Sequence, residues 1–158
     1  NLLLKLFERL NLIEGGVVMT EDLEYLSDDF KNYITEMNFG EEETSLFLLG
    51  YLIAEIGNAQ RSDQNTKKPI LNKINFHGIS PRRLIILSNE VFDKLDQYKV
   101  RQYNEKEFSA MKKLMDKHIK DWRLRDEDNV YYILSGYAFN TYKRIKSSKR
   151  EEGNGERN

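Results

Sequence analysis

Residues 47–60 read FLLGYLIAEIGNAQ and form the most hydrophobic stretch of the chain. Gly50, Ala54 and Gly57 recur in it at i, i+4 and i+7, so a helix here carries a row of small side chains along one face, where a neighbouring backbone can come close. Leucine and isoleucine cover most of the remaining circumference. A helix that is apolar nearly all round must be buried on several sides, which in a soluble protein places it inside a bundle. The sequence therefore predicts a buried central helix over about residues 41–60.

The same stretch does not fit a membrane span. Its unbroken apolar run is shorter than the ~20 residues that a bilayer requires, and Glu55 interrupts it. Three glutamates, Glu41 to Glu43, precede it, and negative charge of this kind suits the N-terminus of a helix in water. We therefore expect no membrane partner.

The composition is that of one globular domain. The chain has 158 residues, 39% of them hydrophobic and 32% charged, which is enough to bury a core of its own. Cysteine is absent, so disulfides and thiolate metal sites are excluded. No targeting segment is visible, and we expect a cytoplasmic location. Because the chain begins at Asn1 and within a helical pattern, we also expect it to be a piece of a longer protein.

Apolar residues at helical spacing extend along nearly the whole chain, and no segment alternates as a strand does. The fold class that this predicts is all-α, a single bundle of six or seven helices around the central helix. The bundle is expected to take up residues 1–146, and the charged residues 147–158 to form a disordered tail. The expected helices are residues 2–14, 20–37, 41–60, 69–76, 80–98, 104–122 and 126–145.

Several of these helices carry recognisable end signals. Ser80 and Pro81 are an N-cap followed by proline at the first helical position. Asn104 with Glu107 resembles a capping box, and residues 88–89 are a candidate break. The last helix is expected to present a wide apolar face made of Val130, Tyr131, Ile133, Leu134, Tyr137, Ala138 and Tyr142.

A search for catalytic or metal-binding residues finds little. His118 and Asp121 are spaced i, i+3, but no second pair accompanies them, so a surface role is favoured over metal ligation. The acidic residues 126–128 stand at an expected helix start, where capping explains them. The chain has no phosphate-binding glycine loop, no nucleophile elbow and no di-iron pattern. We therefore expect no enzyme activity, no cofactor and no metal.

The charge is divided unevenly along the chain. The net charge is −1, yet residues 1–66 hold 13 acidic and 4 basic residues, whereas residues 67–158 hold 13 acidic and 21 basic residues. Such a division can offer a basic face to nucleic acid and an acidic face to a basic protein. The alternative is that the charges only keep the helices soluble.

The basic residues gather in three places: around the short helix 69–76, along one face of the helix 104–122, and near the end of the last helix. Helical spacing makes the second group one positive face, although cations at the end of the last helix also complement the helix dipole. Asn58, Gln60 and Arg61 project where the central helix ends, as nucleic-acid contacts or as caps. The predicted nucleic-acid-binding residues are Lys67, Lys68, Lys73, Arg82, Arg83, Lys112, Lys113, Lys117, Lys120, Arg123, Lys143, Arg144 and Lys146.

Four runs of sequence carry a resemblance to a known family. They are LGYLI at 49–53, PILNKINF at 69–76, EVFDKLDQY at 90–98 and YYILSGY at 131–137. Together they resemble the C-terminal, small-subunit-like region of the type I-B CRISPR Cascade large subunit, the Csh family. The resemblance covers roughly residues 39–142, and its motifs are mostly core positions, which specify fold better than chemistry.

The resemblance implies a non-catalytic helical domain of an RNA-guided antiviral surveillance complex. Such a domain contacts the other subunits of the CRISPR effector complex and holds the backbone of the guide RNA, the target DNA or the displaced strand. In complexes of this kind base pairing reads the sequence, so the protein need only supply a positive surface of matching shape. The alternative function is an all-helical protein–protein adaptor that binds no nucleic acid.

Overall fold

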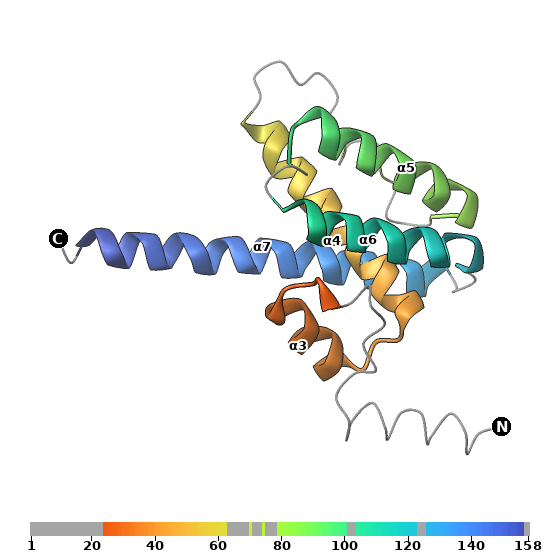
Figure 1. The fold of residues 1–158 in the computed structure, drawn as a ribbon, viewed down its shortest axis with the longest axis horizontal. Helices are drawn as coiled ribbons and strands as arrows, with labels where there is room; N and C mark the ends of the chain where they lie inside the picture. Colours follow the sequence, from red (N-terminus) through yellow and green to blue (C-terminus); the bar gives the residue numbers. More distant parts are fainter. Residues whose placement is uncertain are drawn as a thin grey trace.

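The computed structural model describes residues 24–62, 70, 74, 79–100, 104–122 and 126–156. These residues form five α-helices and one 3-10 turn, and none of them lies in a strand, so the described chain is all-α as predicted. The expected helices 2–14 and 69–76, apart from two isolated positions, and the start of the expected helix 20–37 lie outside the described residues, and the count of six or seven stays a prediction. The elements are α3 (Asp28–Met37), α4 (Glu41–Arg61), α5 (Pro81–Gln97), α6 (Glu105–His118), η3 (Ile119–Asp121) and α7 (Asp126–Glu156) (Figure 1).

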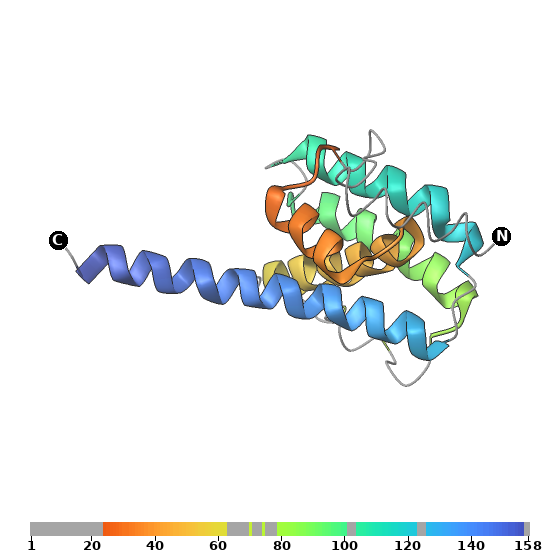
Figure 2. The ribbon, with the colours of Figure 1, turned by 90° about the horizontal axis from the view of Figure 1, so that it is seen from below.

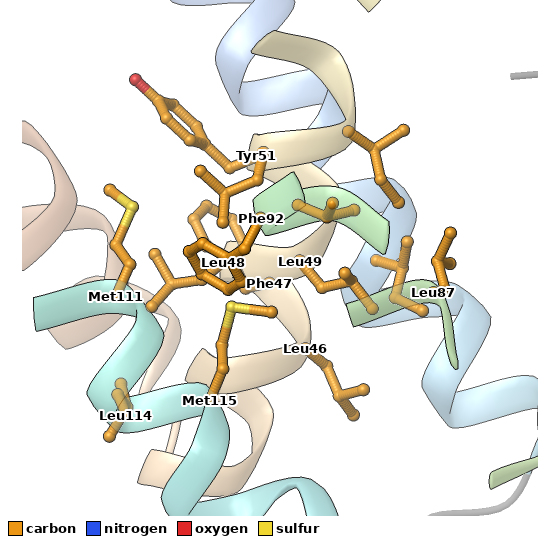
Figure 3. Close-up of a cluster of buried hydrophobic side chains, with 14 of the residues drawn as sticks. Leu46, Phe47, Leu48, Leu49, Tyr51, Leu87, Phe92, Met111, Leu114 and Met115 are labelled. Atoms are coloured by element: carbon orange, nitrogen blue, oxygen red, sulfur yellow. The ribbon is translucent and has the colours of Figure 1, made fainter. Parts of the chain in front are cut away.

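Helix α4 is the most deeply buried element of the described chain. Of its 21 residues, 14 are buried, and they cover every side of the helix from Thr44 to Gln60. Helices α5, α6 and α7 all contact it. Its leucines join Leu87 and Phe92 of α5 and the methionines of α6 in one apolar cluster (Figure 3). Its place at the centre of the complete bundle stays a prediction, because the first 23 residues are not described.

Two glycines let α4 and α7 touch backbone to backbone. A Cβ atom added to Gly50 would lie 1.8 Å from the carbonyl oxygen of Ile133, and one added to Gly136 would lie 1.8 Å from that of Phe47. No L side chain fits at either distance, so the glycines set how closely the two helices approach. Gly50 of the predicted small-residue row therefore faces a neighbouring helix, while Gly136 was not singled out from the sequence.

Aromatic rings attach α3 to the α4–α7 pair. The ring centroid of Phe30 lies 6.1 Å from that of Phe47 and 5.4 Å from that of Phe139. Tyr33 of α3 stacks on Phe47 at 5.1 Å. Such pairs bury large apolar areas in offset or edge-to-face geometry. Helix α3 ends at Asn38, whose left-handed φ of 57° lets the Phe39 amide donate to the Ile34 carbonyl and complete the cap.

Several helix boundaries differ from their predictions. Ser80 does cap α5, accepting a hydrogen bond from the Arg83 amide at 3.2 Å, but α5 runs unbroken through residues 88–89. The capping box at Asn104 is not formed, because the Asn104 amide bonds to the Glu107 carboxylate and caps no backbone group. The predicted helix 104–122 divides into α6 and η3, after which Trp122 is buried with its indole N–H 2.7 Å from the Ser45 hydroxyl.

Helix α7 continues to Glu156, through ten residues of the segment for which the sequence predicts a disordered tail. Low hydrophobicity does not prevent a helix that is already nucleated by its packed N-terminal half from propagating. Its C-terminal part extends beyond the other helices (Figures 1 and 2). No helix among the described residues is long and apolar enough to cross a membrane.

Candidate nucleic-acid interface

The structure places nine of the thirteen predicted nucleic-acid-binding residues, since Lys67, Lys68, Lys73 and Arg123 lie outside the described residues. The nine are spread over three α-helices and the 3-10 turn: Arg82 and Arg83 lie in the first turn of α5, Lys112 to Lys120 lie on α6 and η3, and Lys143, Arg144 and Lys146 lie on α7. These cations differ in whether they pair with carboxylates of the same chain.

The cations of α6 are partly neutralised within the protein. The Lys112 ammonium lies 2.7 Å from the Asp116 carboxylate and 5.5 Å from the ring centroid of Phe92. Lys117 lies 3.2 Å from a carboxylate oxygen of Glu41, at the start of α4. Lys113 and Lys120 are exposed. Of the basic face that helical spacing predicts, two charges therefore lie against carboxylates of the same chain.

His118 belongs to the same internal arrangement. Its Nε2 atom lies 2.8 Å from the Glu41 carboxylate, and within the described ranges no group of three or more potential metal ligands occurs. Burial would raise the pKa of Glu41, but the hydrogen bonds from His118 and Lys117 outweigh it and hold that pKa below its ordinary value. The last turn of α6 thus neutralises the acidic first turn of α4, which complements both helix dipoles.

Two cations of α7, Arg144 and Lys149, lie beside the end of α4, where the structure has a groove. The groove has a volume of about 380 Å³ and is lined on one side by α4 and on the other by α7. Its polar lining consists of Asn58 and Arg61 of α4 with Tyr137, Asn140, Thr141, Arg144, Ser148 and Lys149 of α7. We call this the α4–α7 groove. Three cations, three hydroxyls and two amides converge there from two elements.

A buried network fixes one side of the groove. Asn140 is 1% exposed, and its amide nitrogen donates to the Tyr51 carbonyl at 3.1 Å and to the Glu55 carboxylate at 2.8 Å. Its oxygen accepts from Arg144 Nε at 2.8 Å, and Arg144 also pairs with Glu55 at 2.8 Å. The guanidinium of Arg144 is thereby held in one orientation, with its charge partly balanced by Glu55.

Arg61 and Lys149 are less constrained than Arg144. Arg61 is exposed and donates to the Tyr137 hydroxyl at a distance of 3.5 Å, which is a long hydrogen bond. Lys149 is exposed on the projecting part of α7. The Lys143 ammonium, by contrast, lies 5.7 Å from the ring centroid of Phe30. Lys146, on the next turn of α7, is exposed. Guanidinium and ammonium groups are the side-chain groups that bind phosphate oxygens.

The sequence pointed to part of this groove and missed the rest. Arg144 was predicted, and Arg61 and Asn58 were noted as projecting groups, but Gln60 does not project: it is 5% exposed and accepts a hydrogen bond from the Ile70 amide at 2.8 Å. Lys149 was assigned to the tail. The available signal was the spacing of Gly136, Asn140 and Arg144 at i, i+4 and i+8, which puts a close-approach residue, a buried amide and a cation on one helix face.

Comparison with known families identifies the family of this chain. A family model described as the C-terminal domain of the CRISPR-associated protein TM1802 (cas_TM1802) matches residues 1–151. The chain belongs to this family. No curated protein and no solved structure gives a significant match. Membership in the TM1802 C-terminal domain family supports a role in a CRISPR system, and the match extends past the predicted bundle into residues 147–151.

Proposed function

We propose that this chain is a non-catalytic helical subunit or domain of a type I CRISPR surveillance complex, where it contacts neighbouring subunits and the backbone of the guide–target duplex or of the displaced strand. The family match supports the CRISPR role, and the resemblance to the type I-B large subunit motivates the choice of complex. The observation that carries nucleic-acid binding is the α4–α7 groove, with cations from two elements beside hydroxyl and amide donors.

The groove has the chemistry of backbone recognition. Phosphate contacts come mainly from arginine, lysine, hydroxyl and amide groups, and they position a nucleic acid without reading its sequence. RNA-guided complexes leave sequence reading to base pairing, so a domain of this kind needs only such contacts. We place the main contacts at Arg61 and Lys149 rather than on α6, because Lys112 and Lys117 are paired with Asp116 and Glu41.

The test is the salt dependence of binding to a fluorescent single-stranded oligonucleotide, measured by anisotropy for the whole chain. Each phosphate contact that is lost should flatten the slope of log affinity against log salt by about 0.7. We expect the Arg61→Gln, Lys149→Gln double variant to flatten it by roughly 1.4. The matched control is Lys113→Gln, Lys120→Gln, which removes the same charge from α6 and η3 and should leave the slope close to that of the wild type.

The possible outcomes decide between locations and functions. If the control flattens the slope and the groove variant does not, the interface lies on α6 and the groove assignment is wrong. If the wild-type chain shows no salt-dependent binding, nucleic-acid binding by this domain is refuted. The protein–protein adaptor then becomes the better-supported function. The pairing of Lys112 with Asp116 and of Lys117 with Glu41 already makes the α6 face less cationic than that of a nucleic-acid-binding helix.

A further inference from the structure

A second hollow lies beside the α4–α7 groove, and Arg144 borders both. It has a volume of about 570 Å³. Four of its lining residues do not line the groove, and these are Tyr51, Glu55, Lys143 and Ser147. We call this space the second hollow. The Glu55 carboxylate therefore belongs to the second hollow, and Arg144 stands between that carboxylate and the groove.

The guanidinium of Arg144 has more hydrogen-bond donors than the fold uses. Its Nε donates to the Asn140 side-chain oxygen, and an Nη2 atom lies 2.8 Å from a Glu55 oxygen. An arginine offers five N–H donors in a fixed fork, so donors remain for a further acceptor. The Arg144 side chain is 36% exposed, which lets an anion in the groove reach it.

The charge of Arg144, in contrast, is already balanced. The Glu55 side chain is only 20% exposed, and a partly buried ion pair is screened less by water than a surface pair. A phosphate that approaches Arg144 from the groove also approaches the Glu55 carboxylate, which repels it. Asn140 holds both partners of the pair, so the fold has already met the entropic cost of ordering them.

We propose that Glu55 is an internal competitor for phosphate at Arg144, and that it limits how tightly the α4–α7 groove binds a nucleic-acid backbone. The inference rests on the proposed function, because it concerns the same groove. A backbone phosphate carries one negative charge, as Glu55 does, but it has to be ordered on binding. In the wild-type chain Arg144 therefore stays with Glu55, and the phosphate contacts are left to Arg61 and Lys149.

The competition predicts a gain of binding when the carboxylate is neutralised. In Glu55→Gln the side-chain oxygen can still accept from Asn140, but the amide nitrogen then faces Arg144 and cannot hold it. The guanidinium is released while its Nε stays bonded to Asn140. The slope of log affinity against log salt for a fluorescent single-stranded oligonucleotide should become steeper by about 0.7, and binding at about 0.1 M salt should be roughly fivefold tighter.

Two variants separate a released contact from general attraction. Asp116→Asn adds the same unit of charge and releases Lys112 on α6, and it should leave the slope at the wild-type value. The double variant Glu55→Gln, Arg144→Gln has the net charge of the wild type and lacks the released cation, so its slope should return to the wild-type value. Thermal melts show that each variant is folded at the temperature of measurement. Glu55→Ala, which also removes the carboxylate, should steepen the slope as Glu55→Gln does and provides the test if the glutamine variant does not fold.

The outcomes distinguish this inference from the proposed function. A wild-type chain that binds, with an unchanged slope in Glu55→Gln, overturns the competition and leaves the proposed function intact. A steeper slope that persists in the double variant, or that Asp116→Asn equals, also overturns it. If the wild-type chain does not bind, the proposed function fails by itself. Binding that then appears in Glu55→Gln and disappears in the double variant supports the competition, and its absence from both variants overturns it.

Discussion

At Gly50 and Gly136 the backbones of α4 and α7 are in direct contact. A methyl group at Gly50 would meet a carbonyl oxygen that belongs to the helix backbone and cannot rotate away. The cost of accommodating it is a shift of one whole helix against the other, which separates many neighbouring contacts at once.

We expect Gly50→Ala to lower the free energy of unfolding by at least about 1–3 kcal/mol, the range of core overpacking. Urea denaturation followed by circular dichroism measures it. The matched control is Gly40→Ala, where the new methyl group would meet only the end of the flexible Glu43 side chain, so the loss should be smaller. Equal losses at the two sites would mean that the α4–α7 crossing is looser than described.

Glu41 gives the fold a pH dependence of definite sign. Its carboxyl has a folded-state pKa below the ordinary 4.5, so the charged form is stabilised by folding. This contribution is complete above the unfolded-state pKa and is lost as the pH falls through the folded-state value. Unfolding free energies measured from pH 7 down to pH 3 should therefore decline less steeply in Glu41→Gln than in the wild type.

The control for Glu41 is Asp116→Asn, which also removes a carboxylate from a lysine pair. Its side chain is 51% exposed, and exposed pairs contribute little. The acid part of its stability curve should match that of the wild type. A Glu41→Gln curve that is parallel to the wild type throughout would contradict the assignment of the pKa to the His118 and Lys117 hydrogen bonds.

At the scale of elements, the buried Asn140 joins α7 to α4 through hydrogen bonds to the Tyr51 carbonyl and the Glu55 carboxylate. Replacing it with alanine leaves the Tyr51 carbonyl without its side-chain donor and removes one partner of Glu55. We expect Asn140→Ala to cost roughly 1–3 kcal/mol of stability. Thr141→Ala, one residue along and exposed, should stay within about 0.5 kcal/mol, and a similar cost at both sites would refute a special role for Asn140.

The described helices could be predicted from the sequence. Their ends could be predicted only where a single residue determines them. Ser80 caps α5 because its hydroxyl reaches a backbone amide three residues on, which is a local matter. Asn104 could have done the same, but its amide binds the Glu107 carboxylate, and burial, with the nearby Glu55 charge, raises the pKa of Glu107. That environment is made by distant segments, so the sequence around Asn104 could not reveal it.

The buried and exposed sides of α7 could not be told apart from the sequence either. Apolar residues occur on both sides of the helix, so periodicity alone predicts one wide face. What decides the packed side is the Gly136 contact with Phe47, and that partner lies 89 residues earlier in the chain. The candidate groove depends on the same choice, because it determines that Arg144 faces Arg61 across the helix pair.

At the scale of the whole molecule, the division of charge along the sequence is not a division in space. Glu41 belongs to the acidic half of the chain, yet it pairs with Lys117 and His118 of the basic half. Glu55 pairs in the same way with Arg144. Folding thus neutralises part of the charge separation that composition indicates. Excess positive charge is better sought where α7 leaves the bundle, a conclusion that required the three-dimensional arrangement.

Until α7 has been synthesised, the side of α4 that it covers is exposed to water. Helix α4, apolar on nearly every side, is made before α5 and α6, and the helix that covers its glycine face is the last of the described helices. The nascent chain therefore carries an uncovered apolar surface until α7 has been made, the condition that attracts chaperones and favours aggregation.

A chain that stops at Trp122 keeps α3 to α6 and never acquires that cover. We expect it in the insoluble fraction of expressing cells, or bound to chaperones, and we expect residues 123–158 supplied from a second gene to bring it into the soluble fraction. Recovery of a soluble, cooperatively melting protein that lacks α7 would show that the first four described helices protect α4 by themselves.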